Sequence, residues 1–296
     1  MKTIHYFLSI CMCLAACTGN GDPEEELEIE EPCPDLSDVN PHFAYGDYLL
    51  ERLAYMGMER PSDSYNYPVY PGMAEWGKLS STAERRALCQ VTPECLLRKM
   101  STQAVIQAIW ELPVIEEFMI FSDPLYQINI NGQERLYNAY KELFKRKDAV
   151  AALLKRLTLV IPYTYFPRYE SQVLEFLLCH PDFFSQLNES EKRKIVEITL
   201  SNDEKRYGVW VYDGFGFPFA RTAAWILMGK AMYTIGYEPF IMAMNENKEL
   251  KYFIEGWRPN PSDPSKMVIY FYNYSDFFDG NIPQLITDHA KNFIND

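Results

Sequence analysis

The sequence predicts an all-α protein, either an irregular α-solenoid or a multi-helix bundle of stacked helical hairpins, with a long irregular N-terminal loop. Apolar residues recur at helical spacing through most of the chain from residue 41 onward. Proline, glycine and capping residues interrupt that spacing, so successive helices should be joined mainly by short breaks. Only Met267 to Tyr274 is β-branched and aromatic enough to predict a short strand.

The first part of the domain is expected to be a helix followed by a loop. Residues 43–58 place apolar side chains on one side of a predicted helix. Residues 60–78 are rich in residues that interrupt regular structure, including Pro61, Pro68, Pro71 and Gly72. This stretch predicts a long irregular loop packed on the surface of the domain.

Capping residues mark three further helix starts. Thr92, followed by a proline and a glutamate, is expected to cap one helix. Ser101 or Thr102 starts the next helix. Asn188, with Glu191 three residues later, has the spacing of a capping box.

The clearest helical spacing lies in the middle and at the end of the chain. The amphipathic helices expected there span residues 136–144, 150–161, 173–178 and 285–293. Ala223 to Ile235 is apolar almost all round and is expected to be the most buried helix. A helix over Phe240 to Phe253 is expected to pack against it.

The N-terminus resembles a bacterial lipoprotein precursor. Residues 1–16 begin with a basic residue and continue as an apolar run that is too short to span a bilayer, as in a secretory signal peptide. The run ends in Leu14-Ala15-Ala16-Cys17, which resembles a lipobox, where the precursor is acylated on the cysteine and cut before it. The resemblance implies a mature chain anchored through Cys17. The alternative is an ordinary signal peptide in which Cys17 is incidental.

Residues 17–40 are predicted to be an acidic flexible tether ahead of a single helical domain over residues 41–296. Eight acidic residues lie between Asp22 and Asp35, and their mutual repulsion favours an extended, solvated segment. The segment resembles the tether of surface-exposed Bacteroidetes lipoproteins. Together with Thr18 after the cysteine, the resemblance implies outer-membrane location and surface exposure. The alternative is a spacer that only holds the domain away from the membrane.

The charge of the chain excludes some partners. The net charge is −13, and the tether holds much of it. The modest negative charge left on the domain argues against a nucleic-acid partner, which requires a basic surface. We expect membrane contact through the lipid anchor only, with no cofactor and no metal.

Four cysteines are expected to remain in the mature chain besides the acylated one: Cys33, Cys89, Cys95 and Cys179. An oxidising compartment allows disulfides, and the short loop between Cys89 and Cys95 makes them the expected pair. A Cys33–Cys179 bond is left open, as are reduced, buried cysteines. No second cysteine or histidine pair lies nearby at zinc-ligand spacing.

The sequence contains no metalloprotease, nucleotide-binding or serine-hydrolase motif, so no residue is predicted to be catalytic. His180, just before a proline, is expected at a helix end, and His289 is expected in the core. Carboxylate pairs such as Asp276 and Asp279 are numerous enough to arise by chance.

The most unusual stretch of the domain is an aromatic and glycine-rich segment over residues 207–219. The residues singled out there as a candidate binding loop are Tyr207, Trp210, Tyr212, Phe215 and Phe217. Exposed rings would form a platform for a glycan, a peptide or an aromatic side chain of a partner. The alternative is that the rings fill the core between two helices, with the glycines allowing close backbone approach.

Several landmarks resemble a family of secreted Bacteroidetes lipoproteins with no assigned activity. They are residues 68–76, 89–90, 100–104, 143–149 and 227–230. The resemblance covers most of residues 45–235. It implies the compartment and the extent of the domain.

The hypothesis favoured by the sequence is an outer-membrane, surface-exposed lipoprotein with a non-enzymatic binding or scaffold role toward an envelope protein, peptide or glycan. The alternative is a hydrolase of surface polymers that uses a carboxylate pair in an aromatic-lined cleft. A third hypothesis is a purely structural component of the envelope.

Overall fold

The protein is described by a computed structural model over residues 57–70, 73–89, 92–113, 138–160, 170–206, 219–260, 262–269 and 282–296. These residues form thirteen helices and one two-stranded sheet, which confirms the all-α prediction. The chain divides into two compact units, residues 1–32 and 33–296, and every described residue belongs to the second. The predicted signal peptide, the first predicted helix up to residue 56 and the tether lie outside the described residues.

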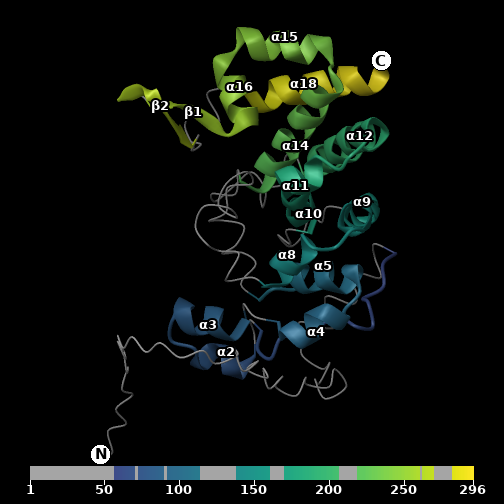
Figure 1. Ribbon diagram of the computed structural model, residues 1–296, viewed down its shortest axis with the longest axis vertical. Helices are drawn as coiled ribbons and strands as arrows, with labels where there is room; N and C mark the ends of the chain where they lie inside the picture. The colour runs from purple at the N-terminus through teal and green to yellow at the C-terminus, as the bar shows by residue number, and fades with distance from the viewer. Residues whose placement is uncertain are drawn as a thin grey trace, which may run out of the picture. The chain divides into compact units, whose positions relative to one another are not determined.

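The helices of the second unit are arranged in successive layers (Figure 1). They span Ala74–Lys78 (α2), Thr82–Cys89 (α3), Glu94–Lys99 (α4), Thr102–Trp110 (α5), Asn138–Leu143 (α8), Ala149–Leu159 (α9), Glu170–Cys179 (α10), Pro181–Phe184 (α11), Glu189–Arg206 (α12), Phe219–Ile235 (α14), Glu238–Glu246 (α15), Lys248–Glu255 (α16) and Ile282–Asn295 (α18). Helix α5 contacts α8 and α9, α9 contacts α10, and α10 contacts α14. The last helix, α18, packs on both α12 and α14.

Local hydrogen bonds explain two of the predicted helix starts. Ser101 Oγ accepts a hydrogen bond from Ala104 N at 3.2 Å and caps α5. Asn188 Oδ1 accepts from Glu191 N at 3.0 Å, while Glu191 Oε2 accepts from Asn188 N at 2.9 Å. This reciprocal pair is the predicted capping box at the start of α12.

Thr92 does not cap a helix, contrary to the prediction. Helix α4 begins at Glu94, with Pro93 at the cap position and no side-chain cap. The backbone of Thr92 is instead bound by Asn138, whose Oδ1 accepts from Thr92 N at 2.9 Å and whose Nδ2 donates to Thr92 O at 2.5 Å. Asn138 therefore fixes the backbone of Thr92 from 46 residues away in the sequence, without capping α4.

The single helix predicted over residues 240–253 is wrong, because the segment forms two helices, α15 and α16. The break lies at Asn247, whose Oδ1 accepts from the backbone N–H groups of Glu249 and Leu250, both at 3.1 Å. Asparagine is a strong cap, so the capping energy favours starting a new helix here. Helix α16 ends at Gly256, which has a φ of +76°.

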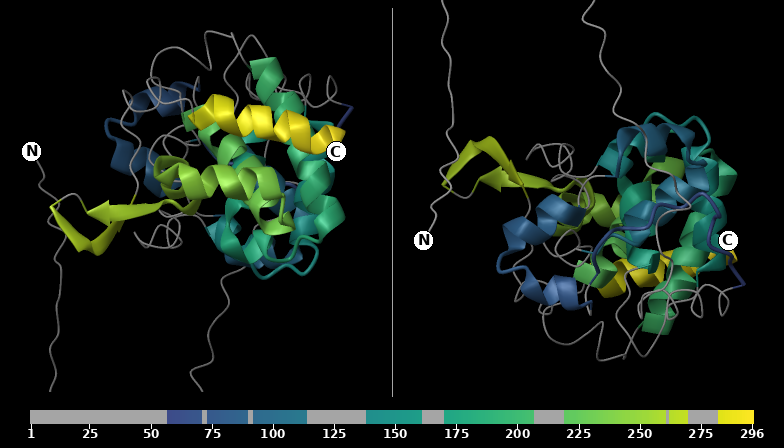
Figure 2. Two further views of the ribbon diagram at one scale, coloured as in Figure 1. Left: turned by 90° about the horizontal axis from the view of Figure 1, so that it is seen from above. Right: turned by 90° about the horizontal axis from the view of Figure 1, so that it is seen from below.

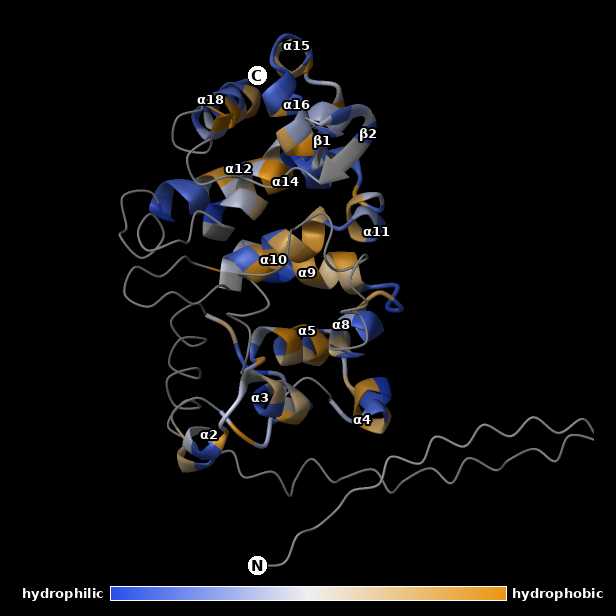
Figure 3. Cartoon of the chain, turned by 90° about the vertical axis from the view of Figure 1, so that its left-hand side faces the viewer, coloured by the Kyte–Doolittle hydropathy of each residue, from blue (hydrophilic) through white to orange (hydrophobic). Residues whose placement is uncertain are grey.

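Helix α14 lies at the centre of the packing, as predicted from its apolar sequence. Residues 222–229 are buried without exception. Figure 3 shows that α14 and the helices of the middle layers carry much of the hydrophobic colouring. Gly229 permits the close approach of α16, because a Cβ atom there would lie 2.2 Å from Ile254 Cδ1.

The remaining elements refine two predictions. The predicted irregular loop contains a five-residue helix, α2, which carries Glu75 in its first turn and Lys78 in its last, as the helix dipole favours. Strands β1 (Trp257–Asn260) and β2 (Asp263–Ile269) pair antiparallel, and Figure 2 shows them extending away from the helices. The part of the predicted strand after Ile269, residues 270–274, lies outside the described residues. None of the described helices is long and apolar enough to cross a bilayer.

Candidate functional site

Five side chains on three helices form a buried ionic cluster: Glu175 of α10, Asp203 and Arg206 of α12, and Arg221 and Trp225 of α14. In the sequence, α12 precedes and α14 follows the predicted aromatic segment. Arg206 binds Glu175 through two parallel contacts, Nη2 to Oε1 at 2.8 Å and Nη1 to Oε2 at 3.0 Å. Both side chains are completely buried. Bidentate geometry gives this ion pair both strength and a fixed orientation.

Asp203 is held from α14 by two side chains, which together supply three donors. Arg221 Nε and Nη2 donate to its two carboxylate oxygens at 2.7 and 2.9 Å. Trp225 Nε1 donates to Oδ2 at 3.0 Å, and the Arg221 guanidinium lies 4.8 Å from the centre of the Trp225 ring. The second carboxylate of the ionic cluster is therefore fully engaged.

The helix ends explain how the ionic cluster relates to the aromatic segment. Asp203 and Arg206 are three residues apart and share one face of α12. Arg206 is the last residue of α12, and Arg221 is the third residue of α14. Residues 207–218 connect these helices. In the sequence, this segment therefore begins directly after Arg206 and ends three residues before Arg221.

Burial controls the electrostatics of the ionic cluster. It raises the pKa of Glu175 to about 7, because the desolvation of the carboxylate outweighs the attraction of Arg206, and the nearby Asp203 adds to the rise. Two carboxylates and two guanidinium groups balance each other in formal charge. This arrangement fixes the three helices together while keeping one carboxyl group near its titration point at neutral pH.

Some buried polar groups on α10 and α12 have no hydrogen-bond partner among the described residues. Gln172, one turn before Glu175 on α10, is completely buried, and neither its Oε1 nor its Nε2 has a partner there. The Nδ2 atom of Asn202 is in the same situation. Each unpaired buried polar group costs about 1–3 kcal/mol.

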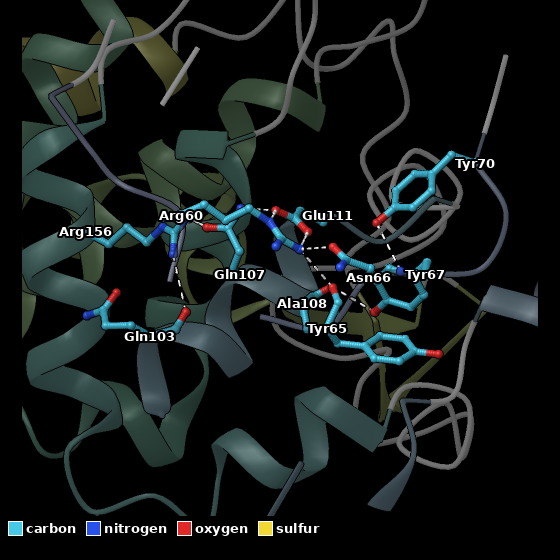
Figure 4. Close-up of polar contacts among 10 residues, drawn as sticks. All are labelled: Arg60, Tyr65, Asn66, Tyr67, Tyr70, Gln103, Gln107, Ala108, Glu111 and Arg156. Carbon is cyan, nitrogen blue, oxygen red and sulfur yellow. Dashed lines mark hydrogen bonds and ion pairs between the residues drawn. The ribbon is translucent and has the colours of Figure 1, made fainter. Parts of the chain in front are cut away.

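A second buried cluster, which we call the N-terminal latch, consists of Arg60, Gln107, Glu111 and Arg156 (Figure 4). Arg60 binds Glu111 through Nε to Oε1 and Nη2 to Oε2, both at 2.7 Å. Gln107 Nε2 donates to Glu111 Oε1 at 2.5 Å, and Arg156 Nη2 donates to Gln107 Oε1. The Arg156 guanidinium also lies 3.9 Å from the centre of the Trp110 ring.

The N-terminal latch ties the irregular segment 57–70 to α5 and α9. Arg60 Nη2 also donates to Tyr65 O at 3.1 Å and to Asn66 Oδ1 at 2.7 Å, which fixes the turn of the segment itself. Tyr67 OH donates to Ala108 O at 2.8 Å. The chain that follows the predicted tether is therefore attached to the helical layers by charge as well as by packing.

The residues predicted as lipidation and binding sites lie outside the described residues. They are Cys17, Tyr207, Trp210, Tyr212, Phe215 and Phe217.

The cysteine predictions have different outcomes. Cys95 forms a disulfide bond, but the side chain of Cys89 is not described, so this pairing stays a prediction. Cys179 is a buried thiol whose Sγ donates to Ala223 O at 3.4 Å. The Cys33–Cys179 bond is therefore absent.

The two histidines that the sequence singled out, His180 and His289, are both described, and the contacts of each are those of a structural residue. His180 lies at the end of α10 as predicted, and its Nδ1 accepts from Asp182 N at 3.3 Å to cap α11. His289 is partly buried against the rings of Tyr237 and Phe240, with centroid separations of 6.3 and 5.5 Å. Its burial lowers the His289 pKa.

The sequence did not single out the ionic cluster or the latch. The available signal was that some charged residues share a helix face with apolar residues, as Asp203 and Arg206 do with the buried Leu200. In the described part of the chain, no group of three or more His, Cys, Asp or Glu side chains is placed to hold a metal ion.

Comparisons with protein-family models, with curated proteins and with solved structures found no match.

Proposed function

We propose that the protein is an outer-membrane, surface-exposed lipoprotein that binds an envelope protein, peptide or glycan without catalysing a reaction. The observation that carries the binding proposal is the ionic cluster at both ends of the aromatic segment. Arg206 and Arg221 each make a bidentate contact to a buried carboxylate, and the segment 207–218 connects them.

A recognition loop gains affinity when its ends are held rigidly. Fixed ends reduce the conformational entropy that is lost on binding, so more of the contact energy is available for affinity. The 12 residues between α12 and α14 contain aromatic side chains and glycines, a composition suited to contact with a flat apolar surface. The buried ion pairs supply the rigid base for such a loop.

Replacing Trp210 by alanine should abolish recovery of the binding partner when the protein is affinity-purified from intact outer membranes. Loss of one large interface ring commonly costs about 2 kcal/mol or more, which is roughly a thirtyfold loss of affinity. The matched control is Tyr233→Ala, which removes a 47 % exposed aromatic side chain near the other end of α14. Recovery of the same partners with wild type and Trp210→Ala would contradict the proposed role of the segment.

Replacing Cys17 by serine should release the protein from the membrane fraction. A serine hydroxyl cannot receive the thioether-linked lipid, and several acyl chains are what holds such a protein stably on a bilayer. The measurement is the distribution of the protein between membrane and soluble fractions, with Cys33→Ser as the control. Continued membrane retention of Cys17→Ser would count against the lipoprotein assignment.

The second candidate function is the hydrolase. The observation that favours it is the Glu175 pKa of about 7 beside a second carboxylate, because such pairs can divide the roles of acid and base. It is the weaker proposal, since both carboxylates are occupied by bidentate arginine contacts. A reacting group would have to displace one of these arginines.

A further inference from the structure

Gln172 of α10 is a buried amide beside the Glu175 carboxyl group. The two residues are three positions apart on one helix, which places their Cβ atoms about 5–6 Å apart on the same face. Both side chains are completely buried. Among the described residues, neither Oε1 nor Nε2 of Gln172 has a hydrogen-bond partner. A buried amide is stable only with partners, so this one requires a donor and an acceptor together.

The ionised form of Glu175 does not supply both. A carboxylate only accepts hydrogen bonds, and its two oxygens already accept from Arg206 Nη1 and Nη2. A protonated carboxyl group has one O–H donor and one carbonyl acceptor. It can therefore donate to Gln172 Oε1 while it accepts from Nε2, which satisfies both atoms of the amide.

The charges around Glu175 allow it to be protonated near neutral pH. Burial raises the Glu175 pKa to about 7, and Arg206 and Asp203 of α12 are the charged groups that act on it. Arg221 of α14 is bound to Asp203. Further groups on α9, α11 and α14 and at the end of α10 are engaged elsewhere or exposed: Lys230 contacts Cys179 O, Arg156 binds Gln107, His180 caps α11, and Asp182 is 73 % exposed.

We propose that Glu175 is a proton switch between α10 and α12: the ionised carboxylate holds Arg206, and the protonated carboxyl group turns to the Gln172 amide and releases Arg206. The proton comes from solvent and forms an O–H bond on one Glu175 oxygen, so the formal charge of the ionic cluster changes from zero to +1. Arg206 is the last residue of α12, and its Nε still donates to Asn202 O at 3.2 Å. Because an excess buried charge is unfavourable, the end of α12 moves outward.

The switch goes beyond the proposed function, because it is a property of two helices and can be measured without a partner. The indole N–H of Trp225 reports on it, since that group donates to Asp203 in the same ionic cluster. In the full chain, its ¹H–¹⁵N resonance is assigned with Trp225→Phe and followed between pH 5 and 9. A shift with a midpoint near 7 is expected, set by the Glu175 pKa of about 7. Hydrogen exchange of amides 203–206, corrected for its intrinsic pH dependence, should be about tenfold faster at pH 5.5 than at pH 8.5.

Two variants test the two states of the switch. Glu175→Gln is neutral at every pH, so it should abolish the Trp225 shift and give fast exchange of amides 203–206 at both pH values. Gln172→Leu removes the partner of the protonated carboxyl group, so the midpoint should fall by about one pH unit, a tenfold change in the protonation equilibrium. Leucine replaces an unpaired buried amide of similar size, so this variant should fold even if Glu175→Gln does not.

The matched control is Glu197→Gln, which neutralises an exposed carboxylate on α12 and should leave both measurements unchanged. A Trp225 shift that persists in Glu175→Gln would overturn the proposal, as would equal midpoints in wild type and Gln172→Leu. Exchange of amides 203–206 that is the same at both pH values in the wild type would show that protonation does not release Arg206.

Discussion

Replacing Arg206 by methionine should lower the free energy of unfolding by roughly 3–5 kcal/mol at pH 8, because it leaves the buried Glu175 carboxylate without its cation. The effect should depend on pH. Burial raises the Glu175 pKa from 4.5 to about 7, so its contribution to stability is complete below pH 4.5 and is lost as the pH rises through 7. Without Arg206 the pKa rises further, so the destabilisation should be larger at pH 8 than at pH 5.

Chemical denaturation at both pH values measures this difference. The control is Lys205→Met, which removes the neighbouring exposed cation and should have little effect. A double variant, Glu175→Leu with Arg206→Met, should recover much of the stability, since an apolar pair can replace a buried ion pair at little cost. A similar loss at both pH values would show that the ion pair is not the cause.

Replacing Arg60 by methionine should loosen the segment 57–70. The change leaves the Glu111 side chain, which is 1 % exposed, without its bidentate cation, at a cost of roughly 3 kcal/mol. It also removes the contacts from Arg60 to Tyr65 O and Asn66 Oδ1. Hydrogen exchange of the backbone amides in this segment should become about tenfold to a hundredfold faster.

Two further variants separate the N-terminal latch from a general loss of stability. Lys78→Met removes an exposed lysine from α2 and should leave the exchange of residues 57–70 unchanged. Adding Glu111→Gln to Arg60→Met removes the unpaired charge and should restore part of the stability. If exchange accelerates equally throughout α5 and the segment, Arg60 stabilises the whole fold rather than this attachment.

Local patterns were sufficient to predict most of the helices. The start of α12 depends on Asn188 and Glu191, which lie within one turn of each other. The break at Asn247 was also encoded locally, because asparagine is a strong cap, but the continuous apolar pattern of residues 240–253 obscured it. The environment of Thr92 is not encoded locally, because its partner, Asn138, lies 46 residues away.

The sequence by itself determined that this protein is helical and where α5 and α12 begin. Its N-terminus resembles a lipoprotein signal, which stays a prediction. These features depend on contacts within a few residues or on composition. Tertiary structure alone decided that Glu175 pairs with Arg206, 31 residues away, and that Arg60 pairs with Glu111, 51 residues away. A charged residue in a helix has many candidate partners in sequence, and only packing brings one of them within hydrogen-bond distance while excluding water.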